Sequence, residues 1–475
     1  MDILQLGEIH HTAVRILNEV GIRTHHAEIR ARLAGLGCRI SDVAIHIPPE
    51  VVERTVAAIP HGFRLYGRSD RRGVLVDAFA PSLCTNTGIL PNIYDFESGA
   101  IRRSVLADVE TSTRMLDALS EVDVVYVSLL DATEAPPHLV TLTDLAATLA
   151  NTTKPLIGPG VTSGPEARAV VAIALALRDG DRGELAARPP CAPFVGMITP
   201  LYLPEDIGDA LLELAHSGLP LMALTNPIMG VTAPYTIAGT VALGHAEMLA
   251  LAVIAHAVRP GLPIVSFNTP SVADMRTLAA TTGGPEAGLM RAAAVEVARH
   301  LGLPSIAHGH TSSARLDIQA ADEKALNSLL IAQARPSLLG GLGGLANVTL
   351  TSYETLVLDN ERFGALRRVL RDVAVDEEHL AFDVVCDMAR GQDAIGHSHT
   401  LHHLRGGEVW RPKLAQRQGL VSGRPEPASL LERARSEARS IMDNHKVEPL
   451  ADSLKGEINA IFQAYDREIT AAARA

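Results

Sequence analysis

The chain has 475 residues, of which 47% are hydrophobic and 20% are charged. This composition provides a large core and excludes a disordered chain, and the length fits one large decorated domain or two to three ordinary ones. The 54 acidic residues outnumber the 42 basic ones, which gives a formal net charge of -12. That balance argues against a nucleic-acid partner and is compatible with a cationic substrate.

The cysteines and the apolar runs indicate where the protein works. Cys38, Cys84, Cys191 and Cys386 are widely spaced and form no C-x-x-C pair, a pattern typical of reduced thiols rather than of disulfides or a zinc ribbon. The start, MDILQLGEIHH, lacks the basic and apolar regions of a signal peptide. No run reaches about 18 uninterrupted apolar residues. We therefore expect a cytoplasmic protein with no membrane partner.

The first 80 residues predict a small α+β cap. Apolar residues recur at helical spacing within residues 5–35, and Pro48 and Pro49 open another helix with Glu50 behind them. The segment FRLYGRSDRRGVLVD, residues 63–77, is short, alternating and rich in turn residues, and predicts a hairpin.

From there the chain alternates between short apolar runs and amphipathic stretches. The eight predicted strands are residues 82–88, 122–130, 154–161, 192–200, 219–227, 262–270, 303–310 and 335–343. Predicted helices fill the gaps, among them 107–120, 138–150, 165–178, 238–258, 286–301 and 319–333. Alternating strands and helices imply a mainly parallel sheet.

Eight such units favour a closed (β/α)8 barrel over a doubly wound sheet. No G-x-G-x-x-G turn follows the first strands, as a dinucleotide-binding fold would require. The expected architecture is thus an α/β fold: an N-terminal cap at 1–80, the barrel at 81–380, and a helical C-terminal extension packed on the barrel at 381–475. Within that extension residues 420–430 predict a hinge before a polar helix pair.

Polar residues cluster where the predicted strands end, which is where such barrels build their sites. They include Asn86, Asn226, Asn268 and the run His308, His310, Thr311. Each has an ordinary explanation as a turn residue. Their shared position at one mouth favours a ligand site.

The spacing His308-x-His310 also opens the metal site of many barrel hydrolases. Such sites need further His or Asp ligands at later strand ends, and the next one offers only GGLGG. A second cluster, His397, His399, His402 and His403, is more typical of a helix start with surface histidines. A metal site therefore stays the weaker alternative, and we assign no metal ligand.

Two charged segments have a structural interpretation beside the functional one. Asp322, Glu323 and Lys324 are expected on a solvated helical face. Tyr353 and Glu354 begin a helix that Thr351 or Ser352 could cap, and Glu354 could instead face a substrate. No G-x-S-x-G, Walker A or H-E-x-x-H motif is present.

Several segments resemble one family. They are IHHTAVRILNEVGIRT, IHIPPEVVERTVAAIPHGFRLYGR, PNIYDFESGAIRRSVLADV, TNPIMGVTAPYTIAGTVALGHAE, TLTSYETLVLDNERFGALRRVLR, IGHSHTLHHLR and DNHKVEPL. In type and order they resemble the trimethylamine methyltransferase family from about residue 7 to residue 450. APYTIAG and SYETLVLDNE are the most specific of them.

The resemblance implies a barrel that moves a methyl group from a methylated amine to the Co(I) of a separate corrinoid-binding protein. The chain itself would bind no cofactor tightly. Founding members use pyrrolysine after the seventh strand to activate trimethylamine, whereas here GLPSIAHGHTSSARLDIQAADEKAL runs unbroken. The chain therefore resembles the non-pyrrolysine branch, some of whose members demethylate glycine betaine. A homo-oligomer is expected by analogy.

The donor is then a quaternary amine, which already carries its positive charge and needs no activation by acid, so the protein's task is positioning and desolvation. Aromatic rings usually hold such a cation, yet only 3% of the residues are aromatic, and Tyr94, Tyr202, Tyr235, Phe267 and Tyr353 are those near predicted loops. The chain also reads Leu345-Ala346 where the family often has Leu-Glu.

From these observations we expect His308, His310 and Thr311 to be catalytic. Asn86, Asn226, Asn268, Phe267, Tyr353 and Glu354 are expected to bind substrate, and a histidine could hold its carboxylate. Two alternatives are a metal-dependent barrel hydrolase and a barrel that binds betaines without catalysis.

Overall fold

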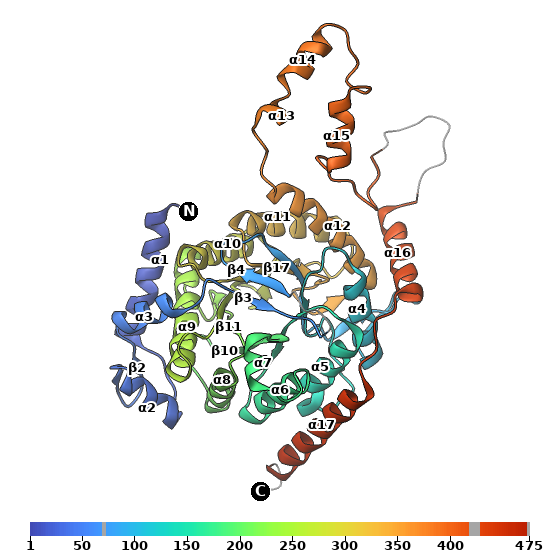
Figure 1. Cartoon of the computed structure of the whole chain (residues 1–475). Helices are drawn as coiled ribbons and strands as arrows, with labels where there is room; N and C mark the ends of the chain where they lie inside the picture. The colour runs from blue at the N-terminus through green and yellow to red at the C-terminus, as the bar shows by residue number, and fades with distance from the viewer. Residues whose placement is uncertain (69–72, 418–427, 473–475) are drawn as a thin grey trace.

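The computed structural model describes residues 1–68, 73–417 and 428–472 of the chain. It is an α/β fold in which parallel strands alternate with helices, and the helices surround the strands (Figure 1). The N-terminal segment contains α1 (Ile3–Arg15), a π-helical turn (Ile16–Val20), α2 (Ala27–Gly35), β1 (Arg39–Ile40), β2 (Ile45–His46) and α3 (Pro49–Ala58). Helices α1, α2 and α3 all pack on one long helix, α9 (Ile237–Val258).

The predicted hairpin is present as β3 (Gly62–Leu65) and β4 (Val74–Asp77), paired antiparallel. Its residues 69–72 lie outside the part of the chain that the structure describes. Pro49 stands at the first position of α3, as its fixed φ favours.

Each of the eight predicted runs overlaps a parallel strand. The strands are β5 (Leu83–Asn86), β8 (Val125–Tyr126), β9 (Leu156–Gly160), β10 (Cys191–Gly196), β11 (Leu221–Thr225), β13 (Ile264–Asn268), β16 (Ile306–His308) and β17 (Leu338–Leu342). They form a five-stranded sheet in the order β13-β11-β10-β9-β8 and a three-stranded sheet in the order β16-β17-β5. Single parallel bridges join Thr85 to Val124 and Ser266 to Ser305, one at each edge of the smaller sheet.

The helices and the remaining short strands connect these eight. The helices are α4 (Leu106–Ala118), a 3-10 turn (Pro137–Leu139), α5 (Val140–Asn151), α6 (Gly164–Ala176), α7 (Arg182–Ala187), α8 (Glu205–Ser217), α10 (Pro285–His300), α11 (Ile318–Ala334) and α12 (Tyr353–Leu370). The short strands are β6 (Asn92–Tyr94), β7 (Ile101–Arg103), β12 (Ile228–Met229), β14 (Ser271–Ala273), β15 (Ala280–Thr281) and β18 (Leu350–Thr351). All six follow the carboxyl end of one of the eight strands. We call the side of the molecule where those ends meet the C-terminal face.

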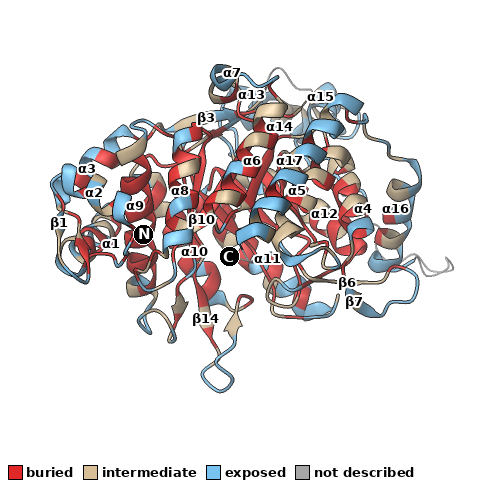
Figure 2. Ribbon diagram, turned by 90° about the horizontal axis from the view of Figure 1, so that it is seen from below, coloured by how far each residue is buried: buried red, intermediate tan, exposed pale blue. Residues whose placement is uncertain are grey.

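Alternation along the strands divides most of the core into two clusters, beside which two smaller clusters lie. One cluster, the inner cluster, contains Val124, Tyr126, Phe194 and Phe267, together with Leu65 and Val76 of the β3–β4 hairpin. The other is the larger cluster that the helices share with the opposite sides of the strands. Figure 2 shows buried residues along the strands and on the helix faces turned toward them. The hairpin therefore packs on the inner cluster.

Helix α9 is the one described helix that is long and apolar enough to cross a membrane by length and composition. Its most apolar window is 83% buried inside the fold. It packs against α1, α3, α8 and α10 and against β11 and β13. This burial on nearly all sides is typical of a core helix.

The C-terminal part is helical, with α13 (Glu377–Leu380), α14 (Phe382–Ala389), α15 (Ser398–Gly406), α16 (Leu430–Asn444) and α17 (Asp452–Ala472). Helix α16 packs against α12 and α4, and α17 packs against α6. Figure 1 shows α13, α14 and α15 standing away from the rest of the molecule. Residues 420–427 of the predicted hinge lie outside the described residues.

Candidate functional site

Four buried rings contact one another near the carboxyl ends of their strands. Ring centroids of Tyr126, Phe194 and Phe267 lie 5.9–6.4 Å from one another, and His308 lies 5.4 Å from Phe267 and 6.0 Å from Tyr126. The contacts are mostly edge-to-face, an arrangement that aromatic rings favour. The rings come from four different strands, β8, β10, β13 and β16. We call this group the aromatic floor.

Glycines on neighbouring strands make room for the floor. A Cβ added at Gly340 would lie 1.8 Å from His308 Cδ2, and one at Gly160 would lie 2.3 Å from the Phe194 ring. At Gly88, just after β5, an added Cβ would meet the Tyr126 ring at 2.1 Å. Each of these rings therefore occupies space that any side chain on the neighbouring strand would take.

Two histidines at the floor present unpartnered polar atoms. His308 and His310 are buried, their rings are 5.4 Å apart, and His308 Nε2 and His310 Nδ1 have no hydrogen-bond partner. Burial, assisted by the charge of Arg291, lowers the pKa of His308 to about 3, and the pKa of His310 is lowered well below its usual value. Both imidazoles are therefore neutral at physiological pH. An unpaired buried nitrogen is costly unless a ligand or water satisfies it.

Thr85 adds a third unpartnered atom on the same side of the strands. Leu83 of β5 packs with the inner cluster and Cys84 with the outer one, so alternation turns Thr85 inward. Its hydroxyl is fully buried and has no partner. Strand β17, which carries Gly340, pairs with both β5 and β16.

Arg291 of α10 fixes the loops around this pair. Its side chain is 2% exposed, and it donates from Nε to the carbonyl of Pro270 at 3.2 Å and from Nη1 to the carbonyl of His308 at 3.0 Å. His308 is the last residue of β16, and Pro270 lies two residues after the end of β13. Burial lowers the pKa of Arg291 to about 10, which leaves the guanidinium charged at neutral pH. Sequence inspection did not single out this residue.

Thr311 is bound to the following helix rather than free. Its hydroxyl donates to Glu323 Oε2 at 2.5 Å, and the same carboxylate oxygen accepts the amide of Ser312 at 2.7 Å. Glu323 of α11 thus holds the loop that carries His310. It does not belong to the freely solvated face that the sequence predicted.

The three predicted asparagines lie in different environments. Asn86 bridges β5 and β8, because its Oδ1 accepts the Tyr126 amide at 2.8 Å and its Nδ2 donates to the Tyr126 carbonyl at 3.1 Å. Asn268 points toward α9, where it donates to the Val241 carbonyl at 3.2 Å. Asn226 is exposed in the loop after β11.

Tyr353 and Glu354 have partners in other helices. Ser352 caps α12, as the sequence allowed. Tyr353 then donates to Asp108 of α4 at 3.1 Å, and Glu354 accepts from Arg435 of α16 at 2.9 Å. Of the predicted site residues, the structure thus brings together Phe267, His308 and His310. Tyr353 and Glu354 instead take part in the packing of α12 against α4 and α16.

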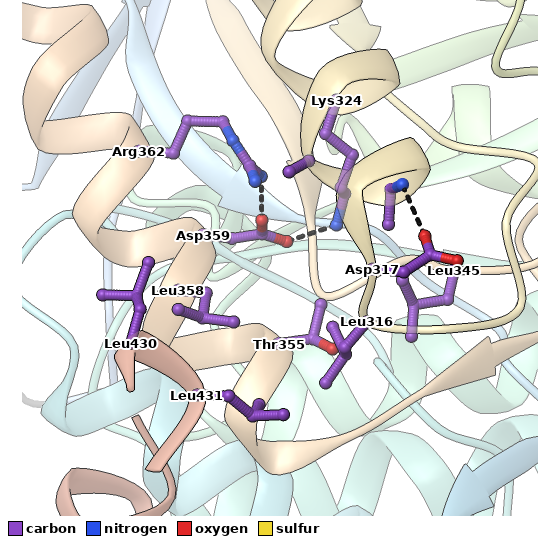
Figure 3. A pocket seen from close by; sticks show the side chains of 12 residues that line it. Leu316, Asp317, Lys324, Leu345, Thr355, Leu358, Asp359, Arg362, Leu430 and Leu431 are labelled. Carbon is purple, nitrogen blue, oxygen red and sulfur yellow. Dashed lines mark hydrogen bonds and ion pairs between the residues drawn. The ribbon is translucent and has the colours of Figure 1, made fainter. Parts of the chain in front are cut away.

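A pocket of about 190 Å³ lies between α11, α12 and the start of α16 (Figure 3). Lys324 is 2% exposed there and pairs with Asp359, which also accepts the Gly343 amide at 2.8 Å. At neighbouring Gly344 an added Cβ would lie 3.2 Å from His310 Nδ1. The solvated position predicted for Lys324 is therefore wrong, because this face of α11 turns toward α12. Its charge helps to keep His310 neutral.

The described residues contain no group of three or more His, Cys, Asp or Glu side chains that could hold a metal ion. The histidines of the second predicted cluster lie on α15, with His397 as its cap.

Sequence inspection missed Tyr126 and Phe194. Both lie inside predicted strands rather than at the strand ends, where polar residues predicted a ligand site. Alternation alone carries a signal for Tyr126, since Val124 and Tyr126 share one side of their strand.

Comparison with known proteins gives the family. The family described as trimethylamine methyltransferase (MTTB) matches residues 1–469. A trimethylamine methyltransferase of Desulfitobacterium hafniense strain DCB-2 is 26% identical over 98% of this chain and 93% of that protein. A glycine betaine methyltransferase of D. hafniense strain Y51 is 26% identical over 97% of this chain and 95% of that protein.

Among solved structures, the monomethylamine methyltransferase of Methanosarcina barkeri superposes with a TM-score of 0.54 at 13% identity, covering 93% of this chain and 87% of that one. This likeness supports the α/β fold over nearly the whole chain. The match to the family extends over almost every residue, and the resemblance inferred from the sequence is confirmed. The chain belongs to the trimethylamine methyltransferase family.

Proposed function

We propose that this methyltransferase moves a methyl group from a quaternary amine, such as glycine betaine, to the cobalt of a corrinoid carried by a separate protein. The observation that carries the proposal is the aromatic floor, which includes the neutral His308, with the neutral His310 beside it. Rings attract an ammonium group through cation–π contact. Because the pKa of His308 lies at about 3, the imidazole adds no positive charge that would repel the substrate.

Different residues of the site would bind the two charged groups of the substrate. The faces of Tyr126, Phe194 and Phe267 suit the methylated ammonium. The unpartnered nitrogen of His308 or the Thr85 hydroxyl could donate to a carboxylate, which a betaine carries. We assign orientation of the substrate to His308 and His310, and we assign Thr311 to the loop that positions them.

The reaction requires little acid–base catalysis from the protein. The partner's corrinoid would supply the nucleophile as reduced cobalt, and the methyl carbon would form its new bond there. The carbon–nitrogen bond breaks with its electron pair left on nitrogen, so a neutral tertiary amine leaves and no proton has to move. The chain would contribute orientation and exclusion of water.

The partner is expected to approach the C-terminal face. Exposed apolar side chains lie there in the loops after β11 and β13, with Tyr235 62% exposed, Met275 54% and Leu278 62%. A surface of this kind suits docking of another protein. The chain itself would hold no corrinoid tightly and would act in the cytoplasm.

We also infer that the eight strands close into one (β/α)8 barrel. The five-stranded and three-stranded sheets are joined by one single bridge from β5 to the residue before β8 and by another from β13 to the residue before β16. Together these contacts supply every neighbour pair that a closed ring of eight strands requires. In this division residues 1–80 form the cap, 81–380 the barrel and 381–475 the C-terminal extension.

The test is methyl transfer from glycine betaine to cob(I)alamin, followed by the spectral change of the corrinoid. Phe267→Leu should weaken binding of glycine betaine by roughly 5- to 30-fold, as expected for loss of about 1–2 kcal/mol of cation–π attraction. Its binding of 3,3-dimethylbutanoate, which has the same shape without the charge, should change much less. Phe363→Leu, a buried phenylalanine of α12, is the matched control and should leave both unchanged.

Absence of transfer from a panel of betaines, with active cob(I)alamin, would refute the proposal. Tight betaine binding without any transfer would instead favour the non-catalytic alternative.

A further inference from the structure

Residues 373–409 form a projection that we call the arm. It leaves the end of α12, carries α13, α14 and α15, and stands clear of the body in Figure 1. All of its residues are described and none is buried. It carries ten of the 31 large hydrophobic side chains that are exposed among the described residues. They are Val373, Val375, Leu380, Phe382, Val385, Met388, Ile395, Leu401, Leu404 and Val409.

The helices of the arm are too short to persist without packing. They contain 4, 8 and 9 residues. Isolated helices shorter than about 12–15 residues are marginal in water, and helices of proteins gain most of their stability from a buried apolar face. Among residues 1–68, 73–417 and 428–472 nothing buries a face of the arm, so cover by another molecule would supply that burial.

Histidines and acids join the two limbs of the arm. His402 Nε2 lies 3.3 Å from a carboxylate oxygen of Glu378, His399 Nε2 lies 3.1 Å from the carbonyl of Glu378, and His397 Nε2 lies 3.8 Å from Asp387. Meanwhile Phe382 of one limb is 73% exposed and Leu404 of the other is 50% exposed. Polar contacts thus join the two limbs, while apolar side chains on both remain exposed.

The apolar area matches that of a stable dimer. Ten such side chains, each more than 40% exposed, present on the order of 500 Å² of apolar surface per chain. Two arms together present on the order of 1,000 Å², which is the apolar share of one standard protein interface.

We propose that the arm packs against the arm of a second copy of this chain around a twofold axis. A second copy is always available in equal number, and a twofold interface needs one surface that matches itself. The methyl acceptor is a poorer occupant. It must reach the C-terminal face, whereas the arm leaves the end of α12, where Arg367 pairs with Asp123 just before β8, at the opposite ends of the strands.

The test is the mass of the full chain in solution by light scattering after gel filtration. The wild-type protein should run as a dimer of the 50.4 kDa chain at micromolar concentration. It should remain so at 0.5 M salt, because an apolar contact between arms with seven acidic and two arginine residues gains from screening. The double variant Phe382→Asp, Leu404→Asp should be a monomer.

Ile318→Asp with Leu326→Asp, two exposed positions of α11, is the matched control and should remain a dimer. Amide hydrogen exchange of α14 and α15 should be slow in the wild type and at least tenfold faster in the arm variant, with exchange in β10 and α9 unchanged. A monomeric wild type, or a dimer that survives the arm substitutions, would overturn the proposal. Neither result bears on methyl transfer.

Discussion

The position of a single ring controls the candidate site, and Gly340 is the residue that permits it. Gly340→Ala would place a Cβ 1.8 Å from His308 Cδ2. The imidazole must then rotate, because the backbone of β17 is held between β5 and β16. We expect a loss of stability of about 1–3 kcal/mol from overpacking and a fall of at least tenfold in kcat/KM.

Gly196→Ala is the matched control. It also lies at the end of a strand, β10, but an added Cβ there meets its nearest neighbour at 3.6 Å, an ordinary contact. Thermal unfolding and methyl-transfer kinetics of both variants decide the matter. Normal kcat/KM in a folded Gly340→Ala protein would show that methyl transfer does not depend on the position of the His308 ring.

Individual residues also mark the limit of sequence-based prediction. His308, His310 and Phe267 could be named because they stand at or next to strand ends. Arg291 and Glu323 could not, since their roles depend on helices α10 and α11 packing against particular loops. Lys324 was predicted to face solvent because charged residues are normally exposed. Its burial is explained by its pairing with Asp359, which the sequence does not show.

At the scale of elements, periodicity predicted more than it did for single residues. Seven of the eight strands of the two parallel sheets lie within their predicted runs, β10 begins one residue before its run, and helices α9, α10 and α11 begin within one residue of the prediction. Local patterns suffice for this because side-chain spacing fixes which face is buried. The arm was beyond such reasoning, since its helices depend on contacts outside a single chain.

Helix α12 supports a prediction about Glu354. This side chain accepts from Arg435 at 2.9 Å, and the guanidinium lies 4.3 Å above the ring of Phe96. Glu354→Gln should loosen α16 and lower stability by about 1–2 kcal/mol, because a mostly buried carboxylate loses its charged partner. The Kd for glycine betaine should stay within about twofold.

Glu97→Gln offers the comparison, since Glu97 pairs with Arg439 of the same helix but is 70% exposed. Such surface pairs contribute about 0–1 kcal/mol. Chemical denaturation measures both costs. A raised Kd in Glu354→Gln with unchanged stability would instead support the substrate role predicted from the sequence.

Over the whole molecule, buried ionisable groups set the dependence of stability on pH. Burial lowers the pKa of His245 and His308 to about 3, and it also lowers the pKa of His256 and His310. The unfolded chain therefore binds more protons than the folded one between about pH 3 and pH 6.5, so stability falls as the pH drops through that window. Each group contributes a slope of up to roughly 1.4 kcal/mol per pH unit.

Two buried carboxyls act in the opposite direction. Burial raises the pKa of Asp144 to about 8 and that of Glu247 to about 7. The folded state then holds protons that the unfolded state releases above about pH 4, so these groups lower stability as the pH rises toward 8. Four histidines outweigh two carboxyls below pH 6.5, and between about pH 6.5 and pH 8 the effect of the carboxyls dominates. Near pH 8 and above, Lys154 and Lys324 oppose it, because burial lowers their pKa to about 8.

The melting temperature should therefore peak between about pH 6 and pH 7 and fall on both sides. Asp144→Asn should flatten the decline from pH 6.5 to 8, because an amide does not titrate, and His308→Gln should flatten the decline below pH 6. His300→Gln, at an exposed position, should change neither limb. Calorimetric scans from pH 4.5 to 8.5 measure the slopes, which count the protons exchanged on unfolding. A melting temperature that rises steadily through pH 8 in the wild type would mean that Asp144 and Glu247 are ionised in the folded protein.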